Sequence, residues 1–282
     1  MSHHDVLETA PLGQVSQYPE QYDAQQLFPI ERASQREVLG ITADKPLPFI
    51  GSDLWQAFEL SWLTPSGKPC VRIGRFTLPA DSSHLIESKS WKLYLNSFNQ
   101  SVFDSEADVV ALMERDLSHA AGGNVTVSLH ALDDPALAGD SLPGICLDEL
   151  DIEVSHYVPT LGLIRVDTSG EEVEETLFSH LLKSNCPVTG QPDWGSVMIR
   201  YRGPKIDRAG LLAYIISYRQ HQDFHEHCVE HIFMDVMAQA QPTSLMVSAR
   251  YVRRGGLDIN PSRATVDYAL DTLQALPRLI RQ

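Results

Sequence analysis

The feature that most constrains the fold of this chain is a weak internal repeat. Three positions recur 120 residues apart, Tyr94, Ser97 and Phe98 being matched by Tyr214, Ser217 and Tyr218. One inserted residue later, segments 103–106 and 224–227 both lead into amphipathic helical patterns, and the turns 64–69 and 187–192 are also alike. Short patterns of this kind also match by chance, but the constant spacing predicts a duplicated strand–strand–helix–strand unit.

Apolar periodicity gives the elements of an α+β chain. Alternation predicts strands over 54–63, 71–78 and 124–132, and 161–166 is a further candidate strand. A helix is expected from about Asp104, with one apolar face formed by Val109, Leu112, Met113 and Leu117.

We divide the chain into an N-terminal arm over 1–45, a first module over 46–160 and a second over 161–282. The arm reads as irregular, and Tyr18, Tyr22 and Phe28 are expected to pin it to the body. The acidic, proline-containing stretch 133–170 is interpreted as the connection between the modules.

Charge and cysteine usage restrict the class of protein. The net charge is −15 and the pI is about 5.0, which argues against a general binder of nucleic acid or anionic membranes. Four irregularly spaced cysteines without a CxxC motif fit a reducing cytosol. Residues 1–28 lack the apolar core of a signal peptide, and no apolar run approaches the ~18 residues of a membrane helix. We therefore expect a cytoplasmic protein without a membrane partner.

A turn-rich loop over 182–194 carries a candidate nucleophile, Cys186, and a carboxylate seven residues later, Asp193. The prolines and the glycine of this loop exclude a continuous helix, so the thiol is expected in a turn near the surface. Lys183 and the N–H groups of the turn could favour the reactive thiolate. A small buried cysteine beside a loop is the competing interpretation.

A second cluster lies at the entry to a helix whose apolar side is predicted to carry Val229, Ile232, Phe233 and Val236. Glu226, near the N-terminus of that helix, is suited to bind an amidine- or guanidine-like N–H edge. His225 beside it can position a substrate or shape the local potential. An exposed polar turn without a role is the alternative.

The same helix also allows a zinc interpretation. His227 and His231 are four residues apart and could face one metal ion, with His225 and Cys228 as further ligands. However, there is no HExxH motif, and His225 and His227 would point about 200° apart on a helix.

Two basic stretches could bind phosphate in this acidic chain. Lys89 and Lys92 share a face on a helical turn, and Arg250 is followed by Arg253 and Arg254 before a pair of glycines. Ordinary surface charge is the alternative for each stretch. No GxGxxG or P-loop motif is present, so a nicotinamide cofactor would not lie on a Rossmann unit.

Four blocks of the sequence resemble the NADPH-dependent 7-cyano-7-deazaguanine reductases, the nitrile reductases of queuosine biosynthesis. The blocks are Glu87-Ser88-Lys89-Ser90-Trp91-Lys92-Leu93-Tyr94, the loop 184–194, Phe224-His225-Glu226 and Arg253-Arg254-Gly255-Gly256. The matches run from about residue 47 to 262 and are similar to the long, two-module form of the family. The resemblance implies tandem tunnelling-fold (T-fold) modules, with antiparallel sheets backed by helices, that assemble into a barrel by oligomerisation.

The resemblance also implies a mechanism. Cys186 would attack the nitrile carbon as a thiolate and form a covalent thioimide, with Asp193 supplying or relaying the proton. NADPH would then deliver two hydrides in succession, through an imine, to give 7-aminomethyl-7-deazaguanine. Holding the imine enclosed would prevent its hydrolysis.

The binding roles that the resemblance implies fall into two sets. Glu226 would bind the 2-amino and N–H edge of the base, with Glu87, His225 and Phe224 as further substrate contacts. No metal ion is expected. The residues assigned to the cofactor are Ser88, Lys89, Ser90, Lys92, Arg253, Arg254 and Gly255. The lysines and arginines of this set would meet the phosphates of NADPH.

Two other functions stay open. One is a zinc-dependent pterin- or GTP-processing enzyme of the same fold that uses Cys228 and the histidines; the other is a non-catalytic purine-binding module that keeps Glu226. Under the reductase hypothesis the partner is a small deazapurine, with no direct contact to nucleic acid. We expect a homodimer or a larger homo-oligomer, because T-fold barrels close only by association.

Overall fold

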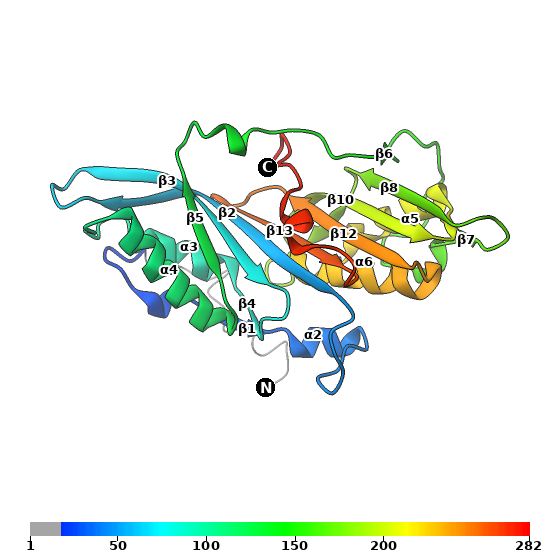
Figure 1. The fold of residues 1–282 in the computed structure, drawn as a ribbon, viewed down its shortest axis with the longest axis horizontal. Coiled ribbons are helices and arrows are strands. Elements are labelled where there is room, and N and C mark those ends of the chain that lie inside the picture. Colours follow the sequence, from blue (N-terminus) through cyan, green and yellow to red (C-terminus); the bar gives the residue numbers. More distant parts are fainter. Residues whose placement is uncertain (1–17) are drawn as a thin grey trace. The chain divides into compact units, whose positions relative to one another are not determined.

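A computed structural model describes residues 18–282 as a mixed α+β chain with antiparallel sheets (Figure 1). Predictions for residues 1–17 lie outside the described residues. The chain folds into two compact units that are discontinuous in sequence. Besides the described residues up to Pro46, the first unit contains Asp53–Ala138 and Arg253–Asp258, and the second contains Leu47–Ser52, Gly139–Val252 and Ile259–Gln282.

The first unit is built on three strands in the order β5-β3-β2, with bounds Thr126–His130, Pro69–Pro79 and Ile50–Leu63. Two helices accompany them, α3 (Ser88–Asn96) and α4 (Glu106–Ala121). The predicted strands and the predicted helix are confirmed. Helix α4 begins at the N-cap Ser105 and buries Val109, Met113 and Leu117, because these residues recur on one helical face.

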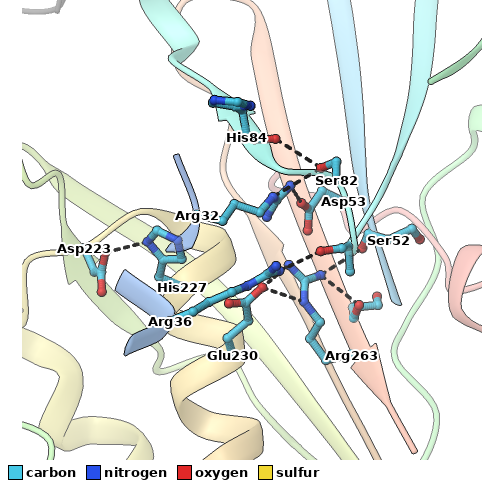
Figure 2. Close-up of polar contacts among 12 residues, drawn as sticks. Arg32, Arg36, Ser52, Asp53, Ser82, His84, Asp223, His227, Glu230 and Arg263 are labelled. Carbon is cyan, nitrogen blue, oxygen red and sulfur yellow. Dashed lines mark hydrogen bonds and ion pairs between the residues drawn. The ribbon is translucent and has the colours of Figure 1, made fainter. Parts of the chain in front are cut away.

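The described part of the N-terminal arm is more regular than expected. It contains η1 (Ala24–Gln26), β1 (Pro29–Glu31), which pairs with β4 (His84–Ile86), and α2 (Ala33–Val38). Tyr22 pins it to the unit, as predicted, because its hydroxyl donates to Asp116 Oδ2 at 2.6 Å. Arg32 forms a buried ion pair with Asp53 at 2.6 Å (Figure 2). The described part of the arm, from residue 18 on, is therefore part of the folded unit.

The second unit contains the strand order β13-β12-β10-β8-β6, whose bounds are Leu257–Ala264, Ser244–Tyr251, Pro192–Gly203, Val173–Ser179 and Ile145–Cys146. Its long helices are α5 (Arg208–Ser217) and α6 (His225–Ala240). Its short elements are η3 (Leu161–Leu163), β7 (Val166–Asp167), β9 (Lys183–Asn185), β11 (Lys205–Ile206), η4 (Tyr218–Gln220) and α7 (Leu270–Gln274), whereas η2 (Pro135–Leu137) is the last element of the stretch Asp53–Ala138 in the first unit. The prediction of a strand over 161–166 is wrong, because its first three residues form the short 3-10 helix η3. Strand β6, within the predicted connection, adds to the sheet edge parallel to β8.

The repeat in the sequence corresponds to a repeated helix pair. Helix α5 begins 120 residues after α3, and α4 and α6 are each 16 residues long. In the first unit Tyr94 donates to Asp116 at 2.9 Å, and in the second Tyr214 donates to Asp235 at 2.7 Å. The serine three residues after each tyrosine donates to that tyrosine's carbonyl oxygen at 2.6 Å. The same Tyr–Asp contact therefore joins the two helices of the pair within each unit.

Helix α6, which begins with the candidate site residues, is anchored in the core of the second unit by a buried ion pair. Both Nε and Nη2 of Arg263 donate to Glu230 Oε1, at 3.1 and 2.8 Å, and both side chains are fully buried (Figure 2). Arg263 also donates to the carbonyl oxygen of Ser262 at 3.0 Å. These bonds satisfy charges that would otherwise be costly to remove from water.

Removing both partners of this pair should be less damaging than the two single removals added together. Arg263→Met or Glu230→Gln alone removes one member of the buried ion pair and should lower the free energy of unfolding by about 3–5 kcal/mol. The double variant should lose less than the sum, and Arg200→Met, at an exposed ion pair, should change the urea midpoint little. Additive losses in urea unfolding would contradict this account.

Candidate active site

The loop of the second unit that carries the candidate nucleophile is a closed turn between β9 and β10. The Gly190 N–H donates to the Cys186 carbonyl at 3.0 Å, and the Cys186 N–H donates to the Gln191 carbonyl at 2.9 Å. Gly190 has φ of 69°, a conformation that favours glycine. Cys186 is only 2% exposed, so the predicted turn is confirmed but the thiol lies beneath the surface.

Asp193, the second residue of β10, meets the first residue of α6. Its Oδ2 lies 3.4 Å from Nε2 of His225, and both side chains are buried. The His225 ring stacks on Tyr251, with centroids 3.8 Å apart and an interplanar angle of 4°. Tyr251 lies opposite Gly195 in the β10–β12 ladder, and a Cβ at Gly195 would approach the tyrosine ring to 3.1 Å. A glycine at this position therefore leaves room for the ring that supports the histidine.

The start of α6 carries two other predicted substrate contacts, Phe224 and Glu226, beside His225, whereas Glu87 lies at the start of α3 in the first unit. Phe224 is the N-cap, and Glu226 lies in the first turn with 2% exposure. The predicted apolar side of the helix, Val229, Ile232, Phe233 and Val236, is fully buried. Asp193, Phe224, His225 and Glu226 are thus brought together by one strand start and one helix start.

The three histidines of the zinc interpretation each lie next to a different carboxylate. His225 meets Asp193, whereas His227 Nδ1 lies 3.2 Å from Asp223 and His231 Nε2 lies 3.4 Å from Asp235 (Figure 2 shows the Asp223 contact). Within residues 18–282, no group of three or more His, Cys, Asp or Glu side chains is placed to hold a metal ion.

The thiol of α6, Cys228, is poorly suited to form a thiolate. Burial raises the pKa of Cys228 well above its usual range, and the negative charge of Asp223 raises it further. Both nucleophilic attack and metal binding need the deprotonated form. The environment of Cys228 therefore argues against both of these roles for it.

The cofactor candidates lie in the first unit, where Glu87 caps α3. Its two carboxylate oxygens accept from the N–H groups of Lys89 and Ser90, at 2.6 and 2.7 Å. Burial raises the pKa of Glu87, and these N–H groups oppose the shift. The Ser90 hydroxyl donates to the Glu87 carbonyl at 2.7 Å. The side chains of Glu87 and Ser90 thus stabilise the start of α3, while Ser88 and Lys89 are partly exposed in its first turn.

Lys92 links α3 to the glycine turn of the other cofactor block. Its ammonium donates to the Gly255 carbonyl at 2.6 Å and to Glu59 Oε2 at 3.0 Å. Gly255 and Gly256 have φ of 57° and 80°, so the turn requires the conformation that glycine adopts readily. The structure therefore brings together two basic stretches that are far apart in the sequence.

The arginines of this block flank the same turn. The Arg253 guanidinium lies over the Phe58 ring, 4.3 Å from its centroid, and the Arg254 N–H donates to the Leu257 carbonyl at 2.9 Å. Arg250, the other basic candidate, is buried in the second unit and donates to the carbonyls of Leu276 and Pro277. These bonds hold its guanidinium against the backbone near the C-terminus.

Two family models match the chain. The model described as "Nitrile reductase, 7-cyano-7-deazaguanine-reductase N-term" covers residues 18–129, and "QueF-like protein" covers residues 192–269. Together these matches span more than half of the 282 residues.

Two curated relatives carry the same name, "NADPH-dependent 7-cyano-7-deazaguanine reductase". The protein of Chromohalobacter salexigens is 64% identical over 267 residues, which cover 94% of this chain and 95% of that protein. The chain belongs to this family. The protein of Dechloromonas aromatica (strain RCB) is 58% identical over 266 residues, covering 94% of this chain and 93% of the relative. The chain is therefore an oxidoreductase of the nitrile reductase family.

One solved structure, the archaeosine synthase QueF-Like in the apo form, is similar over 36% of this chain and 100% of its own. The identity is 17% and the TM-score 0.31, too low to bear on the fold. In the part of the chain that the structure describes, no helix has the length and apolar character needed to cross a membrane.

Substitution of Gly256 tests whether the turn formed by Gly255 and Gly256 requires glycine. Gly256→Ala would adopt a positive φ and would also bring its Cβ to 2.6 Å from the Glu59 side chain. Gly67, with φ of 77° and nothing within 4 Å, is the matched control. Both variants should lose about 1–2 kcal/mol of unfolding free energy through the backbone, and only Gly256→Ala should lose more. Equal losses in urea unfolding would show that Glu59 does not crowd the turn.

Proposed function

We propose that this protein reduces the nitrile of 7-cyano-7-deazaguanine to 7-aminomethyl-7-deazaguanine with NADPH, in queuosine biosynthesis, through a covalent thioimide on Cys186. One observation carries the proposal: the turn with the thiol leads directly into the strand whose Asp193 meets His225, the first residue of the helix with Glu226. The names of the close relatives support the substrate and the cofactor.

The covalent step adds the S–H group across the C≡N bond. The thiolate of Cys186 forms a bond to the nitrile carbon, the nitrile nitrogen takes up one proton, and a C=N double bond remains. Asp193 receives the thiol proton and returns it to the nitrogen as general acid. The contact with His225 at 3.4 Å holds the carboxylate in place, and the stacking on Tyr251 holds the imidazole.

Binding of the base is assigned to the start of α6. A carboxylate accepts from two parallel N–H groups in a fork geometry, and Glu226 would meet the 2-amino and N–H edge of the base in this way. Its place in the first turn of the helix favours the ionised form through the helix dipole. His225 and Phe224 flank that carboxylate and would contact the ring.

The residues of the first unit fit an anionic nucleotide cofactor. NADPH supplies two hydrides in succession when bound. A turn that only glycine adopts readily lies against Lys92, with Arg253 and Arg254 beside it and Lys89 one helical turn earlier. These cations would meet the phosphates, and Ser88 and the Gly255 backbone would add polar contacts. Ser90 would hold the helix start on which Lys89 stands.

The repeated helix pair supports an arrangement as tandem T-fold modules. Each unit holds antiparallel strands with two helices, and the same Tyr–Asp contact joins the helices in both. We propose that the modules complete a barrel by association of at least two chains, and that the only partners in the reaction are small molecules.

The thioimide can be captured by omitting NADPH. Mixing the protein with 7-cyano-7-deazaguanine should raise its mass by one substrate molecule and change its absorbance. Cys186→Ala should abolish both signals, because it removes the nucleophile. Cys228→Ala, a matched change at the other buried thiol, should keep them. An adduct that maps to Cys228 would refute the assignment.

The cofactor assignment predicts a division of labour between the units. Lys89→Ala and Lys92→Ala should each weaken NADPH binding about tenfold, the loss expected for one charge-assisted contact, and leave adduct formation intact. Lys68→Ala, at an exposed turn, is the control. NADPH fluorescence measures the binding, and unchanged affinity in both α3 variants would contradict the proposal.

A further inference from the structure

Most of the hydrogen bonds between the segment before the proposed nucleophile and the segment before the base-binding helix are made by Asn185. Its N–H donates to the His221 carbonyl at 2.8 Å, and its Nδ2 donates to the carbonyls of His221 and Arg219 at 3.1 and 3.3 Å. Its own carbonyl accepts the N–H of Asp223 at 3.1 Å. Four hydrogen bonds thus connect the neighbour of Cys186 to residues 219–223.

Lys183 fixes the orientation of the Asn185 amide. Its ammonium donates to Asn185 Oδ1 at 2.6 Å and to the Arg219 carbonyl at 2.7 Å. Because Oδ1 accepts from a cation, Nδ2 must face the two backbone carbonyls, so the amide has one orientation that satisfies its partners. The two side chains form one unit, which we call the Asn185–Lys183 clamp.

The segment held by the clamp leads directly into the substrate-binding helix. Asp223 Oδ1 accepts the Phe224 N–H at 2.8 Å and lies 3.2 Å from Nδ1 of His227. Although burial raises the pKa of Asp223, hydrogen bonds from His221 and His227 lower it well below its usual range, so the residue is ionised. The start of α6 is therefore fixed from the clamp on one side and from Asp223 on the other.

We propose that Asn185, held by Lys183, is a positioning residue that sets the distance between the Cys186 thiol and the groups that hold the base, Phe224, His225 and Glu226. The inference rests on the proposed function, since it concerns attack of that thiol on a nitrile. A displacement of about 1 Å can cost on the order of 10²-fold in rate when the reacting atoms must be held in near-attack geometry. The clamp acts through the backbone and has no part in proton transfer.

A purely structural role predicts something different. If Asn185 only stabilised the fold, its removal would reduce the folded fraction, but the remaining folded molecules would react at the normal rate. If Asn185 positions the thiol, every molecule would remain able to form the adduct, but slowly. The amplitude and the rate of adduct formation therefore separate the two roles.

The experiment follows adduct formation in full-length protein with saturating 7-cyano-7-deazaguanine and no NADPH, by stopped-flow absorbance with mass spectrometry for amplitude. Asn185→Ala should keep an amplitude of one adduct per chain and lose about 10²-fold in rate. Lys183→Met should lose rate in the same direction, and Lys183→Arg should restore part of it, because it again donates to Oδ1. Gln222→Ala, an exposed side chain in the same segment, is the matched control and should react normally.

Three outcomes would overturn the inference. Asn185→Ala could react at the normal rate, or it could lose amplitude alone. If Asn185→Ala fails to fold, a normal rate in Lys183→Met would have the same meaning. A wild-type protein that forms no adduct would instead refute the thioimide proposal, so the two failures are distinguishable.

Discussion

The contact between Asp193 and His225 is the one on which the rest of the site depends. The carboxylate belongs to the strand that follows the thiol loop, and the imidazole belongs to the helix that carries Glu226. This contact of 3.4 Å therefore joins the loop of the proposed nucleophile to the helix of the proposed base-binding carboxylate. Everything around it restrains one of the two partners. Tyr251 supports the ring, and the Glu230–Arg263 ion pair anchors the helix in the core of the second unit.

The duplicated architecture explains how the functions are divided. Both units contain a helix pair joined by a tyrosine that donates to an aspartate, and both begin the first of these helices with an acidic N-cap, Glu87 and Asp207. Their loops differ. The second unit carries the thiol in a buried turn, whereas the first presents lysines on α3 next to a glycine turn. A repeated scaffold with different loops allows one copy to carry the nucleophile and the other to bind anions.

Much of this organisation could be predicted from the sequence because it depends on local patterns. Alternation placed the strands, the prolines and glycine around Cys186 placed the turn, and helical spacing gave the apolar side of α6. The role of Glu87 as a helix cap was missed, although an acidic residue before a helix start is the signal that could have found it. The stacking of Tyr251 on His225 had no local signal, because it depends on the register that sets Tyr251 opposite Gly195. The clamp is a tertiary contact between residues 34 to 36 positions apart, which periodicity does not report.

Formation of the carbon–sulfur bond before hydride transfer can be observed by carbon-13 NMR, with substrate labelled at the nitrile carbon, stoichiometric protein and no NADPH. In wild-type protein, but not in Cys186→Ala, the resonance of the triply bonded carbon should disappear and be replaced by that of a doubly bonded carbon attached to sulfur. A labelled carbon that stays a nitrile in the bound state, and changes only when NADPH is added, would rule out the thioimide as the first intermediate.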